Sequence, residues 1–215
     1  MQTAPDIAKP ESLPGVADRL IAAGTAEFLR HGFEGASVSR IVQGAECNVR
    51  MIYHYFGNKL GLYRACIDRA YDRLRRAEAA AGFWDLPPRE AIAELVRFTF
   101  DYMQDNPEFQ GLMRIENMAD GVHVRGLNAV NTRAAMLFAA IDRVIRRGVA
   151  AGDFADPGDA GLLYLSILGL STIHIQNRHT MGVVLGRDLS DPGFLRARRE
   201  EVVRIVLASL RRDRA

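Results

Sequence analysis

The sequence predicts an all-α protein in which a small N-terminal three-helix domain precedes a larger helical domain. Apolar residues recur at intervals of three and four from residue 14 onwards, as they do on one face of an α-helix. No segment alternates apolar and polar residues with β-branched side chains, which is the pattern of a half-buried strand. Proline and glycine also stand where helices start and end.

The composition of the 215-residue chain is that of an ordinary globular protein, with 48% apolar and 25% charged residues. The formal net charge is only +2 and the charges within residues 1–60 balance, so any grip on nucleic acid must come from local charge placement. Cys47 and Cys66 lack CxxC partners, so we predict no disulfide, metal site or cofactor. We expect a cytoplasmic protein, because the N-terminus lacks a signal-peptide pattern and the apolar segment 162–175 is too short to cross a membrane.

Helix boundaries are marked by proline and glycine along the whole chain. Proline suits the first helical turn, where its missing N–H costs nothing, and a preceding Asn or Asp can cap the helix. Glycine tolerates the left-handed conformation at a helix end. Helix starts are predicted at Pro14, Pro87-Pro88, Asn106-Pro107, Asp156-Pro157 and Asp191-Pro192, and helix ends at Gly32, Gly82, Gly152 and Gly186.

The predicted elements begin with a flexible arm over residues 1–13, which contain prolines and scattered polar groups. The first helix, over residues 14–31, carries an apolar stripe in which Leu20, Gly24 and Phe28 recur every four residues. The helices that follow are predicted at 37–43, 48–54, 58 or 59 to 81, 88–104, 107–119, 125–151, 157–178 and 191–212. The 157–178 helix is apolar nearly all round, which favours burial against several neighbours.

Residues 37–63 contain two short helices joined by a tight connection at 44–47. Ser37 can cap the first helix and Asn48 can cap the second. The apolar residues available to pack this pair against the first helix are Val38, Ile41, Val42, Ala45, Cys47, Ile52 and Phe56. The residues left on the outer side of the second helix are Val49, Arg50, Met51, Tyr53 and His54. A helix that projects such polar and aromatic groups can enter the major groove of DNA.

The stretch from Leu20 to Tyr63 resembles the DNA-binding domain of the Tet repressor (TetR/AcrR) family. The matching segments, in order, are Phe28-Leu29-Arg30-His31-Gly32-Phe33, Ser37-Val38 with Ile41, Ile52-Tyr53-His54-Tyr55-Phe56, and Asn58-Lys59 with Leu62. The resemblance implies a helix-turn-helix DNA-binding domain over residues 14–60 and a helical effector-binding and dimerisation domain over 61–215. It therefore implies a DNA-binding transcriptional regulator, a repressor in the usual family mode, and not an enzyme.

The family's DNA contacts carry over by position. Ser37 and Lys59 stand where relatives touch phosphates, and the N-terminus of the helix at Lys59 favours anions. Val49 and Arg50 are predicted to contact bases, since Arg50 could bond a guanine bidentately. The full predicted set is Ser37, Ser39, Asn48, Val49, Arg50, Tyr53, His54 and Lys59.

Two positions depart from the family pattern. The family usually has glycine in the turn where this chain has Glu46, and we expect a positive φ there, which is uncommon for a residue with a Cβ. An acidic side chain near DNA would also repel phosphate. The family favours a small residue or Thr where this chain has Met51. Because of both departures, the resemblance does not predict the operator sequence.

The C-terminal part resembles one subgroup of the family, which includes the repressor of pyrimidine utilisation. The matching segments are Asn106-Pro107-Glu108-Phe109, Ile115-Glu116-Asn117 and Asn177-Arg178-His179-Thr180. The resemblance implies a similar fold over residues 75–212, without establishing a pyrimidine ligand.

The family also implies a homodimer that binds a palindromic operator and is released by a small-molecule effector. We expect the helices near 157–178 and 191–212 to pair the subunits, since the final two helices form the dimer interface in this family. An effector site needs apolar bulk and a few convergent polar groups. Helix placement predicts Phe98, Tyr102, Met113, Glu116, Asn117, Phe138, Tyr164 and His174 as its lining.

Plainer interpretations stand beside these. The main alternative is a helical small-molecule-binding or interaction protein without DNA binding. The motifs of common enzymes are absent, and a basic amphipathic membrane binder is disfavoured. Both cysteines are interpreted as small core hydrophobes, although Cys47 could sense oxidants. His174 and His179 are interpreted as structural rather than ligand- or metal-binding, while Glu116-Asn117 could either recognise an effector or cap and bridge helices.

Overall fold

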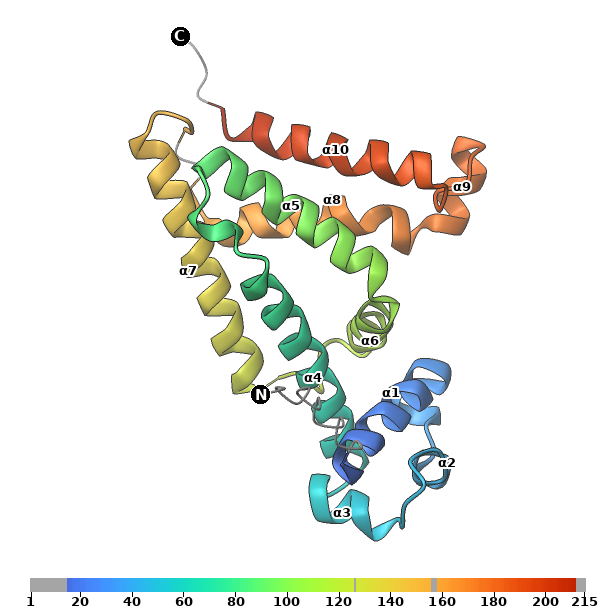
Figure 1. Cartoon of the computed structure of the whole chain (residues 1–215). Coiled ribbons are helices and arrows are strands. Elements are labelled where there is room, and N and C mark those ends of the chain that lie inside the picture. The colour runs from blue at the N-terminus through green and yellow to red at the C-terminus, as the bar shows by residue number, and fades with distance from the viewer. Residues whose placement is uncertain (1–14, 126, 156–157, 212–215) are drawn as a thin grey trace, which may run out of the picture. The chain divides into compact units, whose positions relative to one another are not determined.

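The computed structural model describes residues 15–125, 127–155 and 158–211, and over these residues it contains ten α-helices, one 3-10 helix and no strand (Figure 1). The chain divides into two compact units, one ending at Cys66 and the other beginning at Ile67. The boundary lies within α4 (Lys59–Ala80). The all-α prediction is therefore confirmed, whereas the predicted arm at residues 1–13 and the start at Pro14 lie outside the described residues.

The first unit consists of α1 (Val16–Gly35), α2 (Val38–Gly44), α3 (Arg50–Phe56) and the first turns of α4. The predicted stripe on α1 is buried. Gly24 is part of it because α4 passes close by: a Cβ at residue 24 would lie 3.2 Å from Cδ2 of Leu62. An aromatic pair closes the same core, with the rings of Phe28 and Tyr63 4.8 Å apart edge to face. The largest buried side chains of this unit are Leu20, Phe28, Ile41, Ile52, Leu62 and Tyr63.

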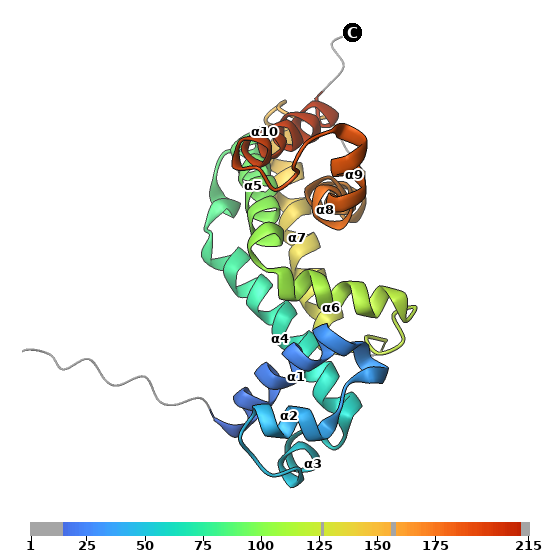
Figure 2. The ribbon, with the colours of Figure 1, turned by 90° about the vertical axis from the view of Figure 1, so that its right-hand side faces the viewer.

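The second unit contains η1 (Phe83–Asp85), α5 (Pro88–Asp105), α6 (Pro107–Met118), α7 (Asn128–Ala150), α8 (Ala160–Gln176), α9 (Arg178–Leu185) and α10 (Pro192–Ser209). Helix α5 is central and packs against α7, α8 and α10 (Figures 1 and 2). Their apolar faces form one core that includes Phe100, Ile141, Phe154, Ile167 and Val202.

The helix starts follow the sequence in part. The side chain of Asp191 accepts a hydrogen bond from the N–H of Phe194 at 2.8 Å, so the predicted cap of α10 is confirmed. Asn106 precedes α6 but makes no capping bond; its Nδ2 donates instead to the carbonyl of Tyr102. The predicted start at Asp156-Pro157 lies outside the described residues. Helix α8 begins at Ala160, where Asp159 accepts from the N–H groups of Gly161 and Leu162.

The predicted helix ends at glycine are confirmed, since all four glycines adopt a positive φ: Gly32 (67°), Gly82 (67°), Gly152 (77°) and Gly186 (61°). At Gly32 the helical geometry of α1 is interrupted by a kink. The helix predicted over 157–178 is confirmed as α8, but the helix that follows it was not predicted. Helix α8 stops at Gln176, and a separate helix, α9, continues to Leu185 before Gly186 ends it.

Candidate nucleic-acid interface and cavity

The connection between α2 and α3 is a tight turn held by backbone hydrogen bonds. The N–H of Ala45 donates to the carbonyl of Ile41, and the N–H of Cys47 donates to that of Val42 at 3.1 Å. Arg19 of α1 donates from Nε to the carbonyl of Ala45 at 3.0 Å, which fixes the turn to the first helix. Glu46 has a φ of 49°, as its place in the turn led us to expect.

Helix α3 presents a polar and aromatic outer face over a buried anchor. Ile52 is fully buried and holds the helix against the unit. Val49, Arg50, Tyr53 and His54 are exposed, as predicted, whereas Met51, predicted on the same side, is half-buried. Asn48 Oδ1 accepts from the N–H of Arg50 at 2.9 Å, so the predicted cap is confirmed. Arg50, whose side chain we expect near bases, is thus the first residue of α3.

Helix α2 is fixed by a carboxylate from α1. Glu27 is buried, and its Oε1 accepts from the N–H of Ser37 at 2.8 Å and from Nε of Arg40 at 2.8 Å. The hydrogen bond from Arg40 is the main reason that the pKa of Glu27 lies below its ordinary value. Ser37 is the N-cap residue of α2, but its side chain makes no capping bond, so that part of the prediction is wrong.

Lys59 lies at the first position of α4 and is partly engaged within the unit. Its Nζ donates to the carbonyls of Glu34 and Ala36, each at 3.3 Å, and lies 4.8 Å from the centre of the Phe33 ring. These contacts place its ammonium beside the start of α4 and the end of α1. Ser39 is exposed on α2.

The second unit contains a partly open cavity of about 460 Å³ between α4, α5, α6, α7 and α8. Its walls are mostly apolar and aromatic and also hold three amide side chains, and among the described lining residues Arg75 alone is charged. This combination is typical of sites for small organic ligands. The lining residues are Tyr71, Leu74, Arg75, Met103, Phe109, Gln110, Met113, Asn117, Ala134, Leu137, Phe138, Tyr164, Leu165, Leu168, Gly169, Thr172 and Gln176.

Four of the eight residues predicted for an effector site line this cavity: Met113, Asn117, Phe138 and Tyr164. Phe98 and Tyr102 of α5 pack against the apolar cluster behind it. Glu116 is buried and organises the segment after α6, where its Oε1 accepts from the N–H groups of His123 (2.7 Å) and Val124 (2.9 Å).

His174 lies on a different face of α8, stacked on Phe100 with ring centres 4.7 Å apart. Among the described residues neither of its ring nitrogens has a hydrogen-bond partner. Burial, with a smaller contribution from the charge of Arg198, lowers its pKa to about 4, so the imidazole is neutral at pH 7.

Comparison with known proteins decides the family. A model of tetR-family bacterial regulatory proteins matches residues 20–66, and a model of tetracyclin-repressor-like C-terminal domains matches residues 88–206. This chain belongs to the TetR family. The transcriptional repressor NicS of Pseudomonas putida is 31% identical over 191 residues, which cover 89% of this chain and 90% of NicS. The repressor SCO4008 of Streptomyces coelicolor is 41% identical over 51 residues, which cover 24% of this chain and 27% of that protein.

Solved structures of TetR-like regulators share the fold. The regulator SCO4942 of Streptomyces coelicolor superposes with a TM-score of 0.68 at 21% identity, covering 91% of this chain and 98% of that one. FadR of Bacillus subtilis, solved in complex with stearoyl-CoA, gives a TM-score of 0.66 at 16% identity, covering 89% of this chain and 98% of that one. The resemblance to the pyrimidine-utilisation subgroup stays a prediction.

As in other TetR-family proteins, the first unit is thus a DNA-binding domain and the chain a transcriptional regulator. Among the described residues, no group of three His, Cys, Asp or Glu side chains could hold a metal ion. No described helix is both long enough and apolar enough for a membrane span. Cys47 and Cys66 are free thiols, and Cys66 is buried with its Sγ 3.5 Å from the carbonyl of Ile21.

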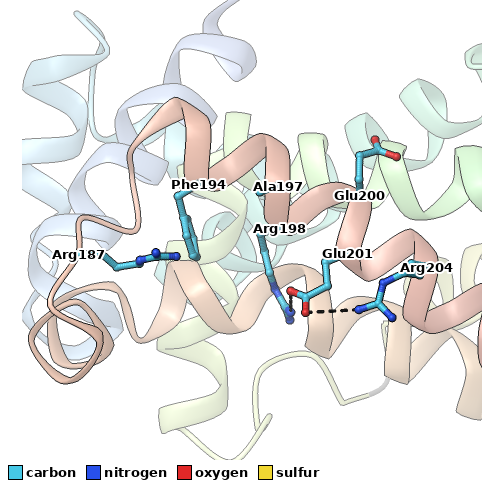
Figure 3. Close-up of a pocket in the computed structure, with 7 residues that line it drawn as sticks. All are labelled: Arg187, Phe194, Ala197, Arg198, Glu200, Glu201 and Arg204. Carbon is cyan, nitrogen blue, oxygen red and sulfur yellow. Dashed lines mark hydrogen bonds and ion pairs between the residues drawn. The ribbon is translucent and has the colours of Figure 1, made fainter.

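A hollow lined by α10 and by Arg187 carries alternating charges (Figure 3). Arg198 Nη1 lies 3.0 Å from Glu201 Oε2, and Arg204 Nη2 lies 3.8 Å from Glu201 Oε1 (Figure 3). The neighbouring α8 exposes large apolar side chains instead, since Leu162 and Leu165 are each 64% exposed and Ile173 is 47% exposed. An apolar row of this size on a helix marks a candidate contact surface.

Proposed function

We propose that this protein is a repressor that binds a palindromic operator as a homodimer and is released by a small-molecule effector held in the cavity of the second unit. The observation that carries the proposal is the outer face of α3, where Arg50, Tyr53 and His54 are exposed over the buried anchor Ile52. Such a face suits the major groove, in which side chains of a recognition helix meet base edges.

The roles of the single residues follow from their places on the surface. Arg50 stands at the start of α3 and is suited to donate two hydrogen bonds to a guanine, together with Val49 for apolar contact. Tyr53 and His54 follow along the same helix and suit the backbone and the groove edge. Ser37 and Lys59 suit phosphate contacts, and Ser39 on α2 and Asn48 before α3 complete the proposed set.

Two copies would read two half-sites about one turn of DNA apart. The exposed apolar row of α8 and the charged hollow beside α10 (Pro192–Ser209) suit the pairing of two subunits. An effector in the cavity would contact α4, which continues into the first unit, so ligand and DNA could favour different states of the chain. FadR of Bacillus subtilis, bound to stearoyl-CoA, supports ligand binding by this fold.

The test is binding of the purified protein to DNA from its own upstream region, compared with a scrambled duplex at two salt concentrations. We expect sequence-selective binding that weakens steeply as salt rises, because phosphate contacts release counterions. Arg50→Ala should lower the preference for the native duplex by roughly 1–3 kcal/mol. Arg76→Ala is the matched control, since Arg76 is an 80% exposed side chain on α4 in the second unit. Absence of DNA binding at any salt would instead favour the alternative of a helical ligand-binding protein.

A further inference from the structure

Among the described residues, the wall of the second unit's cavity has one cationic group and no anionic one. Among its lining residues only Arg75 is charged, and its side chain is 15% exposed. The buried carboxylate of Glu78 pairs with it, Nη1 to Oε2 at 2.5 Å, but Glu78 itself does not line the cavity. The cavity wall therefore offers a cation whose counter-charge, the carboxylate of Glu78, contacts it from outside the lining.

The guanidinium of Arg75 keeps hydrogen-bonding capacity for a ligand. A guanidinium carries five N–H groups in a planar fork. Among the described residues, Arg75 donates to Glu78 and, from Nη2, to the hydroxyl of Tyr164 at 3.2 Å. Three of the five N–H groups are left, which is enough for a carboxylate to bind bidentately.

Four aromatic rings contribute to the cavity wall beside aliphatic and amide side chains. Phe138 and Tyr164 meet edge to face with ring centres 6.1 Å apart, and Tyr71 and Phe109 do the same at 5.3 Å. Burial raises the pKa of both tyrosines, so their hydroxyls are neutral donors near pH 7. Aromatic walls prefer a flat, apolar partner.

From this arrangement we propose that the effector is a small organic acid, with a planar apolar body between the aromatic walls and a carboxylate held by Arg75. This inference rests on the proposed effector role of the cavity and adds its ligand class. The carboxylate would share the guanidinium with Glu78. Burial raises the pKa of Glu78, while its charge and hydrogen-bond contacts with Arg75 act in the opposite direction.

The test uses matched acids and amides as probes: benzoate, phenylacetate and cinnamate, and the corresponding neutral amides. Thermal shift and calorimetry on the full chain measure their binding at millimolar concentration in a buffer low in other anions. We expect at least one acid to bind roughly tenfold or more tightly than its amide, the usual worth of a charge-assisted hydrogen bond. Equal binding of acid and amide, or no binding of any acid, would overturn the proposal.

Two variants test whether Arg75 itself binds the carboxylate, as distinct from a general effect on the fold. Arg75→Met alone would strand the buried Glu78, so the informative variant is Arg75→Met with Glu78→Gln, which removes both charges together. It should lose the preference for acids while still binding the amides. Glu78→Gln alone should bind acids more tightly than the unmodified protein, because Arg75 loses its competitor. Arg76→Gln, a neighbouring exposed cation, should change neither affinity.

Operator binding is measured on the same protein preparations, so that a failure of the ligand proposal can be told apart from a failure of the proposed repressor function. A protein that prefers acids through Arg75 but binds no operator would contradict the repressor function and leave the ligand class intact. A protein that binds its operator yet keeps the acid preference in the double variant would contradict the role of Arg75 alone.

Discussion

Glu27 on α1 and Arg40 on α2 form the contact that joins the first two helices of the DNA-binding unit, with Nε of Arg40 donating to Oε1 of Glu27 at 2.8 Å. The same oxygen accepts the N–H of Ser37, at the start of α2. Glu27→Ala would leave a backbone donor and a guanidinium without this acceptor. We expect the melting temperature to fall by several degrees, and operator affinity to fall with it, while Glu34→Ala on the exposed side of α1 changes neither.

This contact also predicts an acid dependence. The hydrogen bond from Arg40 holds the pKa of Glu27 below its ordinary value of 4.5. A carboxyl with a depressed pKa contributes stability above its unfolded pKa, and the contribution is lost as the pH falls through the folded pKa. The loss of stability below about pH 4.5 should therefore be smaller in Glu27→Ala than in the unmodified protein. Chemical unfolding at a series of pH values measures it, and identical profiles would contradict the contact.

Glu46 holds a backbone conformation that suits glycine, with a φ of 49° in the turn before α3. Replacement by glycine should raise the free energy of unfolding by about 1 kcal/mol. Glycine removes the strain of a side chain in the left-handed conformation, and part of that gain is offset because glycine loses more backbone entropy on folding. Glu46→Gly should also bind DNA more tightly at low salt, because an acidic side chain leaves the neighbourhood of the phosphates. Glu46→Ala separates the two effects: it should tighten DNA binding without the gain in stability.

His174 predicts a loss of stability in mild acid. Its pKa is lowered to about 4 in the folded chain from an ordinary 6.5, because the ring is buried against Phe100 beside the charge of Arg198. The unfolded chain therefore binds the proton more readily, and the folded state loses stability as the pH falls from 6.5 to 4. His174→Leu should flatten the profile in this window. A variant whose profile still matched that of the unmodified protein would show that another group is responsible.

The elements that sequence could predict are those whose signals are local. Gly32 and Gly186 end helices because of their own backbone freedom, and Asp191 caps α10 through the N–H of Phe194 three residues on. The outer face of α3 could equally be predicted, since the exposure of Arg50 and the burial of Ile52 follow from the helical period.

The cavity was less predictable because its walls come from five helices. Helix α8 is apolar nearly all round, so the sequence could not tell that Tyr164 faces the cavity while His174 faces α5. Arg75 was missed among the many arginines of α4, although it shares a helical face with Tyr71 and Leu74, which was the available signal. The break between α8 and α9 at Asn177 has no proline or glycine to mark it.

The exposed apolar row on α8 predicts the oligomeric state. Leu162 and Ile173 are 64% and 47% exposed, and neither lines the cavity. If this row pairs two subunits, a glutamate introduced into it would be buried in the interface without a partner charge, and this strongly disfavours association. The double variant Leu162→Glu with Ile173→Glu should therefore convert a dimer to a 23.8 kDa monomer and weaken operator binding. Light scattering coupled to size exclusion measures the mass.

The control for this variant is Met136→Glu on α7, where a large apolar side chain is 71% exposed away from the row. It should remain dimeric and keep its operator affinity, because its charge stays in water in either state. A double variant that remains dimeric would place the interface elsewhere on the second unit. A monomeric unmodified protein that still protects two half-sites of its operator would mean that the subunits meet only on DNA, through the spacing of the half-sites rather than through α8.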